Sequence, residues 1–399
     1  MLSCRERYID AAQNHRGPML SVISLGFGAV DIFFVMTGFL IALPFLRTPM
    51  ENFSFRGYLW KRFVVRLYPM LVVALIIHCT VFWDGTPLEV FGTSTIPDMV
   101  RQATPNATHS SSNCALSPFN LLFVNNFLPF GGCLIHTWSL SVQGQFYFFF
   151  PLLLMMVGNR KGLIAVSVAA ILLSIGSRLA TYFIFQPILS QAPPAFAFTP
   201  DLMDRFFVFF QLFYAFTLNR FNTIFFGVLL AVLQKYVEGH AAKPPSWMAL
   251  LRNPVINVVV AAFAWYLSSR NAAYQIGSWF YSVCLFIGSP ALAIGICFFI
   301  FISINSLGPV GVLLNRFFSL RIWLLPSKLS YITYLIHPIV IVKSYHTIFR
   351  PVNHDAASTY QYMAFHVVVV YVTSFVLFHL IEEPAAKFLS AMNAKKKAV

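Results

Sequence analysis

Several polar side chains of this sequence lie within or beside long apolar runs, where titratable groups are costly and usually have a function. His136 opens the stretch HTWSLSVQGQFYFFFP, and His337 lies in KLSYITYLIHPIVI. Histidine can take up and return a proton near neutral pH, so both are candidates for acid–base chemistry. Asp31, in GAVDIFFVMTGFLIA, and Gln143 complete the candidate catalytic set. These residue types indicate proton transfer at a site enclosed by apolar segments.

A second kind of chemistry is indicated by the stretch FRGYLWKRFVVRLYP. Arg62 and Arg66 are four residues apart, which places them on one face of a helix, with Lys61 beside them. Two guanidinium groups on one face suit the oxygens of a phosphate group. The alternative is that they bind anionic lipid headgroups, which any basic cluster next to a membrane attracts.

The composition identifies the setting of these residues. The chain has 399 residues, of which 58% are hydrophobic and 10% charged, whereas a soluble domain carries about 25% charged residues. It is therefore expected to be an integral membrane protein. A net charge of +14 would favour a nucleic-acid partner in a soluble protein. Here the basic residues lie between apolar runs and act as topology signals, so we expect membrane lipids and no nucleic acid as partners.

Apolar stretches long enough to cross a bilayer recur along the whole chain. They lie near 24–46, 64–83, 137–157, 162–185, 207–233, 254–268, 278–304, 329–346 and 361–382. The expected fold class is all-α: one polytopic transmembrane helical bundle of about nine spans, over residues 1–399. Asn219 and Arg220 fall in the middle of the long stretch 207–233.

The basic residues predict the orientation of this bundle. The segments 47–66, 158–161, 235–252, 305–328 and 384–399 hold 17 of the 27 Lys and Arg residues, so we expect them to face the cytoplasm. The C-terminus is then cytoplasmic, and with nine spans the N-terminus is extracytoplasmic. Because no apolar segment precedes the first span, we also expect that one leading helix is missing from this sequence.

The longest polar interval, 84–135, is expected to be an extracytoplasmic loop. It contains the glycosylation sequon Asn106-Ala-Thr108. Cys114 and Cys133 lie on this outer side, where a disulfide can persist, and we predict that they are bonded. The alternative is two unpaired thiols, while Cys79 is interpreted as a small apolar residue within a helix.

Two of the candidate catalytic residues also have structural interpretations. Asp31 could cap a helix N-terminus through its carboxylate. His337 lies on one stripe with Tyr331 and Tyr334, and a single histidine in a membrane helix is more often a hydrogen-bonded core residue than a catalyst.

Two acidic residues end the last predicted span. Glu382 and Glu383 either pair with the arginines of KRFVVRLYP or mark a helix end.

Six motifs together resemble one known family. GAVDIFFVMTGFLIA, KRFVVRLYP, HTWSLSVQGQFYFFFP, LNRFNTIFFGVLLA, KLSYITYLIHPIVI and HLIEEP occur in the order found in the acyltransferase type 3 family of polytopic membrane proteins. That family includes bacterial polysaccharide acetylases and animal nose-resistant-to-fluoxetine-like proteins. The resemblance runs from about Gly28 to Leu389.

The resemblance implies an enzyme of about ten helices. Such an enzyme moves an acyl group, commonly acetyl, from cytoplasmic acyl-CoA to a hydroxyl of a carbohydrate or lipid acceptor. Arg62 and Arg66 occupy the family's acyl-donor motif, although the family more often spaces this pair by three residues. Acyl-CoA is then a co-substrate, and the resemblance implies no bound cofactor and no metal.

Two departures from the family pattern bear on activity. In the family the basic histidine lies in a first helix, which we expect to be missing from this sequence. Gln143 stands where family members usually have a carboxylate, and an amide keeps the hydrogen bonds but cannot take a proton. The alternative function is therefore a catalytically inactive family member or a transporter-like membrane protein.

Overall fold

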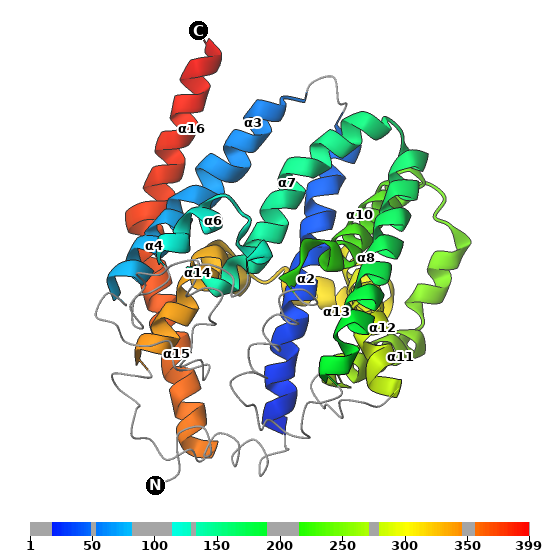
Figure 1. Ribbon diagram of the computed structural model, residues 1–399. Coiled ribbons are helices and arrows are strands. Elements are labelled where there is room, and N and C mark those ends of the chain that lie inside the picture. The colour runs from blue at the N-terminus through cyan, green and yellow to red at the C-terminus, as the bar shows by residue number, and fades with distance from the viewer. Residues whose placement is uncertain are drawn as a thin grey trace.

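The computed structural model describes residues 18–48, 53–81, 114–128, 133–189, 215–270, 279–344 and 356–398. These residues form helices and no β-strand, which confirms the predicted all-α class (Figure 1). Asn106 lies outside the described residues, so the glycosylation sequon stays a prediction. The side on which the interval 84–135 lies also stays a prediction.

The main helical segments follow one another along the chain, with short helices between some of them. They are α2 (Pro18–Arg47), α3 (Phe55–Leu59), the π-helix η2 (Trp60–Leu67), α4 (Tyr68–Val81), α7 (Trp138–Val157), α8 (Arg160–Leu189), α10 (Thr217–Gly239), α11 (Pro254–Arg270), α12 (Trp279–Ile304), α13 (Gly308–Phe318), α14 (Leu324–Ser344), α15 (Ala356–Leu377), the π-helix η12 (Phe378–Glu382) and α16 (Glu383–Ala398). The short helices are η4 (Cys114–Leu116), α6 (Ser117–Leu121), η5 (Asn125–Phe127), η7 (Ile135–Thr137), η9 (Ser246–Arg252) and η10 (Arg321–Trp323).

Within the described ranges, seven helices are long and apolar enough to cross a membrane. Two more helix pairs meet the same criteria but are bent by 71° and 82°, so the count rises to nine if each pair is one span. Nine is the number of spans that the apolar stretches predicted. The chain is therefore an integral membrane protein of helical type.

Two predicted boundaries were wrong. Helix α10 begins at Thr217, so Asn219 and Arg220 lie in its first turn and not at mid-span. Glu382 and Glu383 do not mark a helix end, because the helix continues through η12 into α16. The wider π-turn lies just before Pro384, whose ring would clash in a regular α-turn, and this lets the helix continue.

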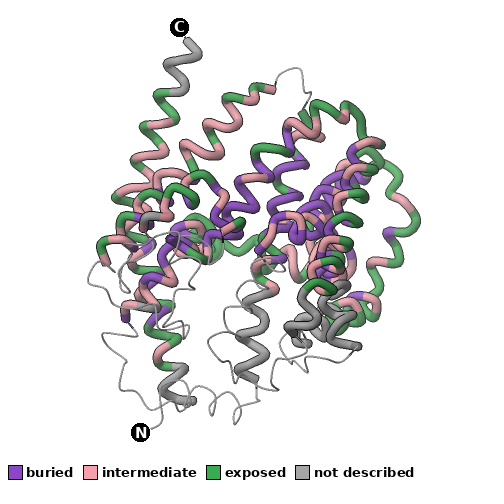
Figure 2. The backbone as a smooth tube through the Cα atoms, viewed as in Figure 1, coloured by how far each residue is buried: buried purple, intermediate pink, exposed green. Residues whose placement is uncertain are grey.

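The buried residues concentrate where α2, α7 and α10 meet, whereas most described residues of α15, α16 and α11 are exposed or half-buried (Figure 2). Helices whose outward faces are apolar are typical of a lipid environment. Helices α2, α7 and α10 therefore contribute most of the core, which α4 and α14 complete, and the candidate site lies among these helices.

Helices α2 and α10 touch through their backbones at two glycines. A Cβ atom at Gly38 would lie 1.9 Å from the carbonyl oxygen of Ile224, and one at Gly227 would lie 2.1 Å from that of Val35. Small residues allow this close approach in membrane helices, where packing and not the hydrophobic effect drives association. The crossing fixes Thr37, next to Gly38, in the middle of the bundle.

Replacing Gly38 with alanine is expected to force α2 and α10 apart and to lower the free energy of unfolding by about 1–3 kcal/mol. Thermal unfolding of the detergent-solubilised protein measures this effect. Gly176→Ala on α8 is the matched control, because nothing lies within 4 Å of a Cβ there. A Gly38→Ala variant as stable as the control would show that the two helices do not cross this closely.

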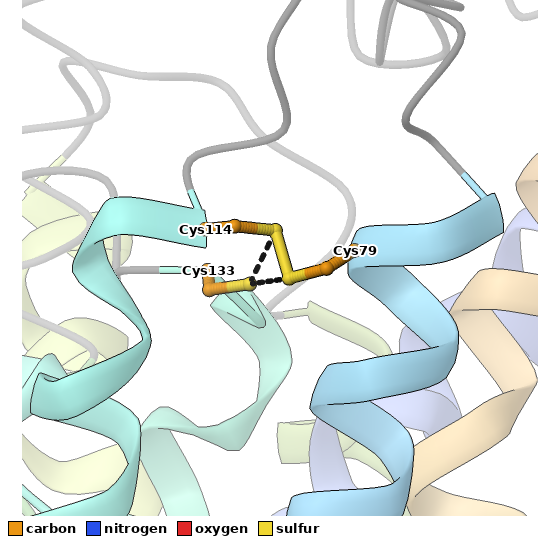
Figure 3. A group of neighbouring side chains, drawn as sticks. All are labelled: Cys79, Cys114 and Cys133. Atoms are coloured by element: carbon orange, nitrogen blue, oxygen red, sulfur yellow. Dashed lines mark hydrogen bonds between the residues drawn. A yellow bond between two sulfur atoms is a disulfide. The ribbon is translucent and has the colours of Figure 1, made fainter.

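The predicted disulfide between Cys114 and Cys133 is wrong in this structure. Cys114 is bonded to Cys79, and Cys133 is a buried free thiol whose sulfur lies 3.6 Å from that of Cys114 and 3.8 Å from that of Cys79 (Figure 3). Cys79 is not simply an apolar helix residue, since it lies in the last turn of α4 beside the start of η4. The prediction considered only the cysteines between apolar runs, and a cysteine at the end of a span was left out.

Candidate functional site

The polar residues at the start of α7 divide onto two faces of the helix. Ser139 and Gln143 are four residues apart and share one face, while Ser141 and Gln145 share another. All four lie in or at the edge of the core, which requires hydrogen-bond partners for each of them. The partners differ between the two faces, and so do the roles.

The face that carries Ser141 and Gln145 holds the segment before α7 in place. Gln145 donates to the side-chain oxygen of Asn126 at 2.9 Å, and Asn126 donates to Thr217 of α10 at 2.7 Å. Ser141 donates to Asn125. These contacts connect η5, α7 and α10, so this part of the polar stretch is structural.

The other face leads to a group of four residues that we call the histidine end: His136, Ser139, Tyr334 and His337. The ring centroids of His136 and His337 are 5.5 Å apart, and Tyr334 lies 5.3 Å from His136. The Tyr334 hydroxyl donates to the carbonyl of His136. Ser139 Oγ lies 2.6 Å from the same hydroxyl. Two segments almost 200 residues apart in sequence are thereby joined at one point.

The hydrogen bonds of His337 define its tautomer. Nδ1 lies 2.8 Å from the carbonyl oxygen of Tyr334 and 3.2 Å from that of Thr333. A carbonyl oxygen only accepts, so Nδ1 carries the proton and Nε2 keeps its lone pair. His337 is thus arranged to accept a proton through Nε2.

Further along α7 from the histidine end, Gln143 connects α7 to α2. Its amide nitrogen donates to Thr37 Oγ1 at 3.2 Å and to the hydroxyl of Tyr147, one turn further along α7. Ser139, Gln143 and Tyr147 therefore form one line of polar groups, which we call the α7 polar face. At 1.5 Å per residue it extends over about 12 Å.

The α7 polar face ends at the predicted donor arginines. The guanidinium of Arg62 lies over the rings of Tyr147 and Tyr58, at 5.5 and 5.7 Å from their centroids. It forms no ion pair with the described carboxylates. Arg66 is exposed, and its charge acts on Tyr147 and on Glu382. Arg62, which lies over two tyrosine rings and pairs with no described carboxylate, is the better candidate for binding a phosphate group.

Asp31 belongs to a different group of residues. Its carboxylate accepts from Arg220 at 3.0 Å and from Ser289 at 3.3 Å, and the Arg220 guanidinium lies 5.4 Å from the Trp138 ring. Both charged side chains are buried. The helix-cap interpretation of Asp31 is wrong, because α2 begins well before it at Pro18.

Of the acids at the end of η12, only one lies near the arginines. The charge of Arg66 acts on Glu382, whereas Glu383 pairs with Lys387 at 2.9 Å and with His379 at 3.2 Å.

The structure thus brings some predicted residues together and separates others. His136 and His337 meet, and Gln143 lies on the face between them and Arg62. Asp31 lies apart and approaches α7 only through Arg220 and Trp138.

The roles of Arg220 and Tyr147 were not predicted from the sequence. The signal for Arg220 was an arginine inside an apolar run, which needs a buried partner. Tyr147 shares the spacing of four residues with Gln143 and Ser139, and that periodicity marks the same face.

Comparison with known proteins adds one match. A family model described as an acyltransferase domain matches residues 8–381, nearly the whole chain. No curated protein and no solved structure matches the chain.

Proposed function

Because the chain belongs to this acyltransferase family, we propose that it transfers an acyl group, most simply acetyl, from acyl-CoA to a hydroxyl of a carbohydrate or lipid acceptor at the membrane. The observation that supports this proposal best is the α7 polar face. It joins an arginine suited to the phosphates of the donor to a pair of histidines suited to proton transfer. Neither end alone would distinguish an acyltransferase from another membrane protein.

We propose that the arginine end faces the cytoplasm. Helices α2, α7 and α10 end, and α3 and α8 begin, at the same side of the bundle (Figure 1). These helix ends carry Arg47, Arg56, Lys61, Arg62, Arg160, Lys161 and Lys235. Such a concentration of basic residues favours the cytoplasmic side, where acyl-CoA is present. The C-terminus is then cytoplasmic and the N-terminus extracytoplasmic.

In this proposal the acyl-CoA phosphates bind at Arg62, and its extended thiol arm lies along the α7 polar face. The acceptor hydroxyl approaches from the histidine end. His337 Nε2 takes the hydroxyl proton while the oxygen attacks the thioester carbonyl. The CoA thiolate then leaves and takes the proton back, so His337 returns to its first state. The Tyr147 hydroxyl, which accepts from the Gln143 amide, can donate its own O–H to the oxyanion on the carbonyl, so Gln143 acts by orienting this hydroxyl.

This role for Gln143 differs from that of a carboxylate. Its amide nitrogen donates to the hydroxyls of Thr37 and Tyr147, so the O–H of each hydroxyl can donate to another acceptor. A carboxylate at position 143 would instead accept from both hydroxyls. Proton transfer in this chain is therefore assigned to histidine and not to Gln143.

Replacing Arg62 with glutamine is expected to weaken acyl-CoA binding by about 1.5–3 kcal/mol, since charge-assisted hydrogen bonds to phosphate are lost. Calorimetry or equilibrium dialysis with the solubilised protein measures the change in Kd. Arg160→Gln is the matched control, because Arg160 also lies over a tyrosine ring, that of Tyr236 at 5.2 Å. Equal effects of the two changes would assign Arg62 to lipid headgroups.

The overall proposal is tested by reconstituting the protein in vesicles with radiolabelled acetyl-CoA and candidate hydroxyl acceptors. Label in the acceptor fraction, absent when acyl-CoA is omitted, supports it. Acyl-CoA binding without any transfer would indicate an inactive member of the family.

A further inference from the structure

Three cysteine sulfurs gather where α4, η4 and the segment before η7 meet (Figure 3). Cys79 and Cys114 form the disulfide, and the Cys133 sulfur lies 3.8 and 3.6 Å from theirs. All three ligand atoms lie within 4.8 Å of one another. A bonded pair with a third thiol in contact is the arrangement in which thiol–disulfide exchange takes place.

Several contacts keep Cys133 in this position. Its backbone N–H donates to the side-chain oxygen of Asn120 at 3.0 Å. Asn120 in turn donates to the Leu134 carbonyl at 3.1 Å and to Thr137 Oγ1 at 2.8 Å. The backbone at Cys133 is therefore fixed by hydrogen bonds, and its thiol faces the bridge.

We propose that Cys79, Cys114 and Cys133 form one disulfide-exchange centre, in which the Cys133 thiol displaces either sulfur of the Cys79–Cys114 bridge. The chain then holds one disulfide and one thiol among three residues, and the identity of the free cysteine changes. Nothing in this inference depends on the proposed acyl transfer.

The exchange step is balanced and needs no oxidant. The Cys133 thiol loses its proton, and its sulfur forms a new bond to Cys79 or Cys114. The old S–S bond breaks, and the sulfur that leaves takes up the proton. The number of disulfides and thiols stays the same.

The resting structure makes this step slow. The three sulfurs form a triangle, so the thiol lies beside the bond and must move before it attacks along the bond axis (Figure 3). Burial also raises the pKa of Cys133 to about 12, which leaves little thiolate at neutral pH. Uncatalysed rearrangement of disulfides takes on the order of minutes to hours.

The disulfide-exchange centre lies next to the histidine end along the chain. Cys79 directly follows His78 at the end of α4, and Cys133 precedes His136 by three residues. A bridge from Cys133 to Cys79 would tie the end of α4 directly to the segment that carries His136. The current bridge ties α4 to Cys114 instead, and the segment that carries His136 is held to Asn120 of α6 by hydrogen bonds.

The test uses the full chain with Cys4, Cys284 and Cys297 replaced by serine, which leaves the three cysteines of the centre. The solubilised protein is incubated without added oxidant at about pH 9, where thiolate forms, and in parallel at about pH 5. Samples are quenched with acid and alkylated with a maleimide, and peptide mass spectrometry locates the label. The label is expected on Cys133 at the start and, with time at the higher pH alone, also on Cys79 and Cys114.

A second variant tests directly whether Cys133 can form a disulfide with Cys79. Cys114→Ser in the same background removes the resting bridge, and Cys133 is then expected to bond Cys79 during expression. Label confined to Cys133 at every time, together with two free thiols in Cys114→Ser, would overturn the proposal. Three reduced thiols with one equivalent of zinc or copper would also overturn it, and would identify a thiolate metal site instead.

Discussion

Acyl transfer is expected to fall by about 10²- to 10⁴-fold when His337 is replaced with alanine, because the general base is lost. The Nδ1 proton of His337 is held by two backbone carbonyls, so Nε2 alone can accept a proton from the acceptor. The loss should appear in kcat, while acyl-CoA binding at Arg62 stays unchanged. Transfer from radiolabelled acetyl-CoA to the acceptor, measured with the vesicle-reconstituted variant, gives the rate.

His379→Ala is the control for this experiment. His379 is exposed and pairs with Glu383 on the continuous last helix, away from the histidine end. Its replacement should leave the rate within about twofold of the original. If His337→Ala retained full activity, the histidine end would be a structural contact between α7 and α14, and the base would lie elsewhere.

The second large effect concerns the buried ion pair between Asp31 and Arg220. Replacing Asp31 with asparagine is expected to lower the free energy of unfolding by about 3–5 kcal/mol, because it leaves the Arg220 charge without its carboxylate in the core. Chemical unfolding of the solubilised protein measures the loss. Arg220→Gln should have an effect of similar size, and the double variant should cost less than the two single changes together.

A second, exposed ion pair serves as the control for the buried pair of Asp31 and Arg220. Arg47 and Glu238 form an ion pair between the same two helices, α2 and α10, but their side chains are 51% and 30% exposed. Water screens such a pair, so Glu238→Gln should cost about 1 kcal/mol or less. Equal losses at both pairs would show that burial does not set the energy of the Asp31–Arg220 contact.

The helical architecture was largely predictable from the sequence, because an apolar run of about 20 residues has few structures available in a membrane. The boundaries were less predictable. The apolar run before Thr217 continues into α10 without a change in composition, so hydropathy alone could not locate the start of the helix. A helix end at Glu382 and Glu383 was one of two interpretations, and a π-turn lets the helix continue past these residues and Pro384.

The candidate site was only partly predictable. Spacing of four residues is sufficient to place Ser139 and Gln143 on one face of a helix. Periodicity cannot say which face of α7 meets α14, so the contact between His136 and His337 required the fold. The pairing of Cys79 with Cys114 is a long-range contact between a helix end and a short turn, and no local pattern encodes it.

The π-helix η2 explains an irregularity in the sequence. The family pattern that the sequence resembles more often spaces this arginine pair by three residues. Arg62 and Arg66, the arginines proposed to bind the acyl donor, are four residues apart and lie within the π-helical segment Trp60–Leu67. A π-turn contains one residue more than an α-turn, so a helix can absorb a single inserted residue there and keep its register on either side. The segment from Tyr68 onward can then pack as it would in a chain without the insertion. We therefore infer that the spacing of four is a one-residue insertion, and an alignment of this chain to proteins with the spacing of three is expected to place its gap within η2.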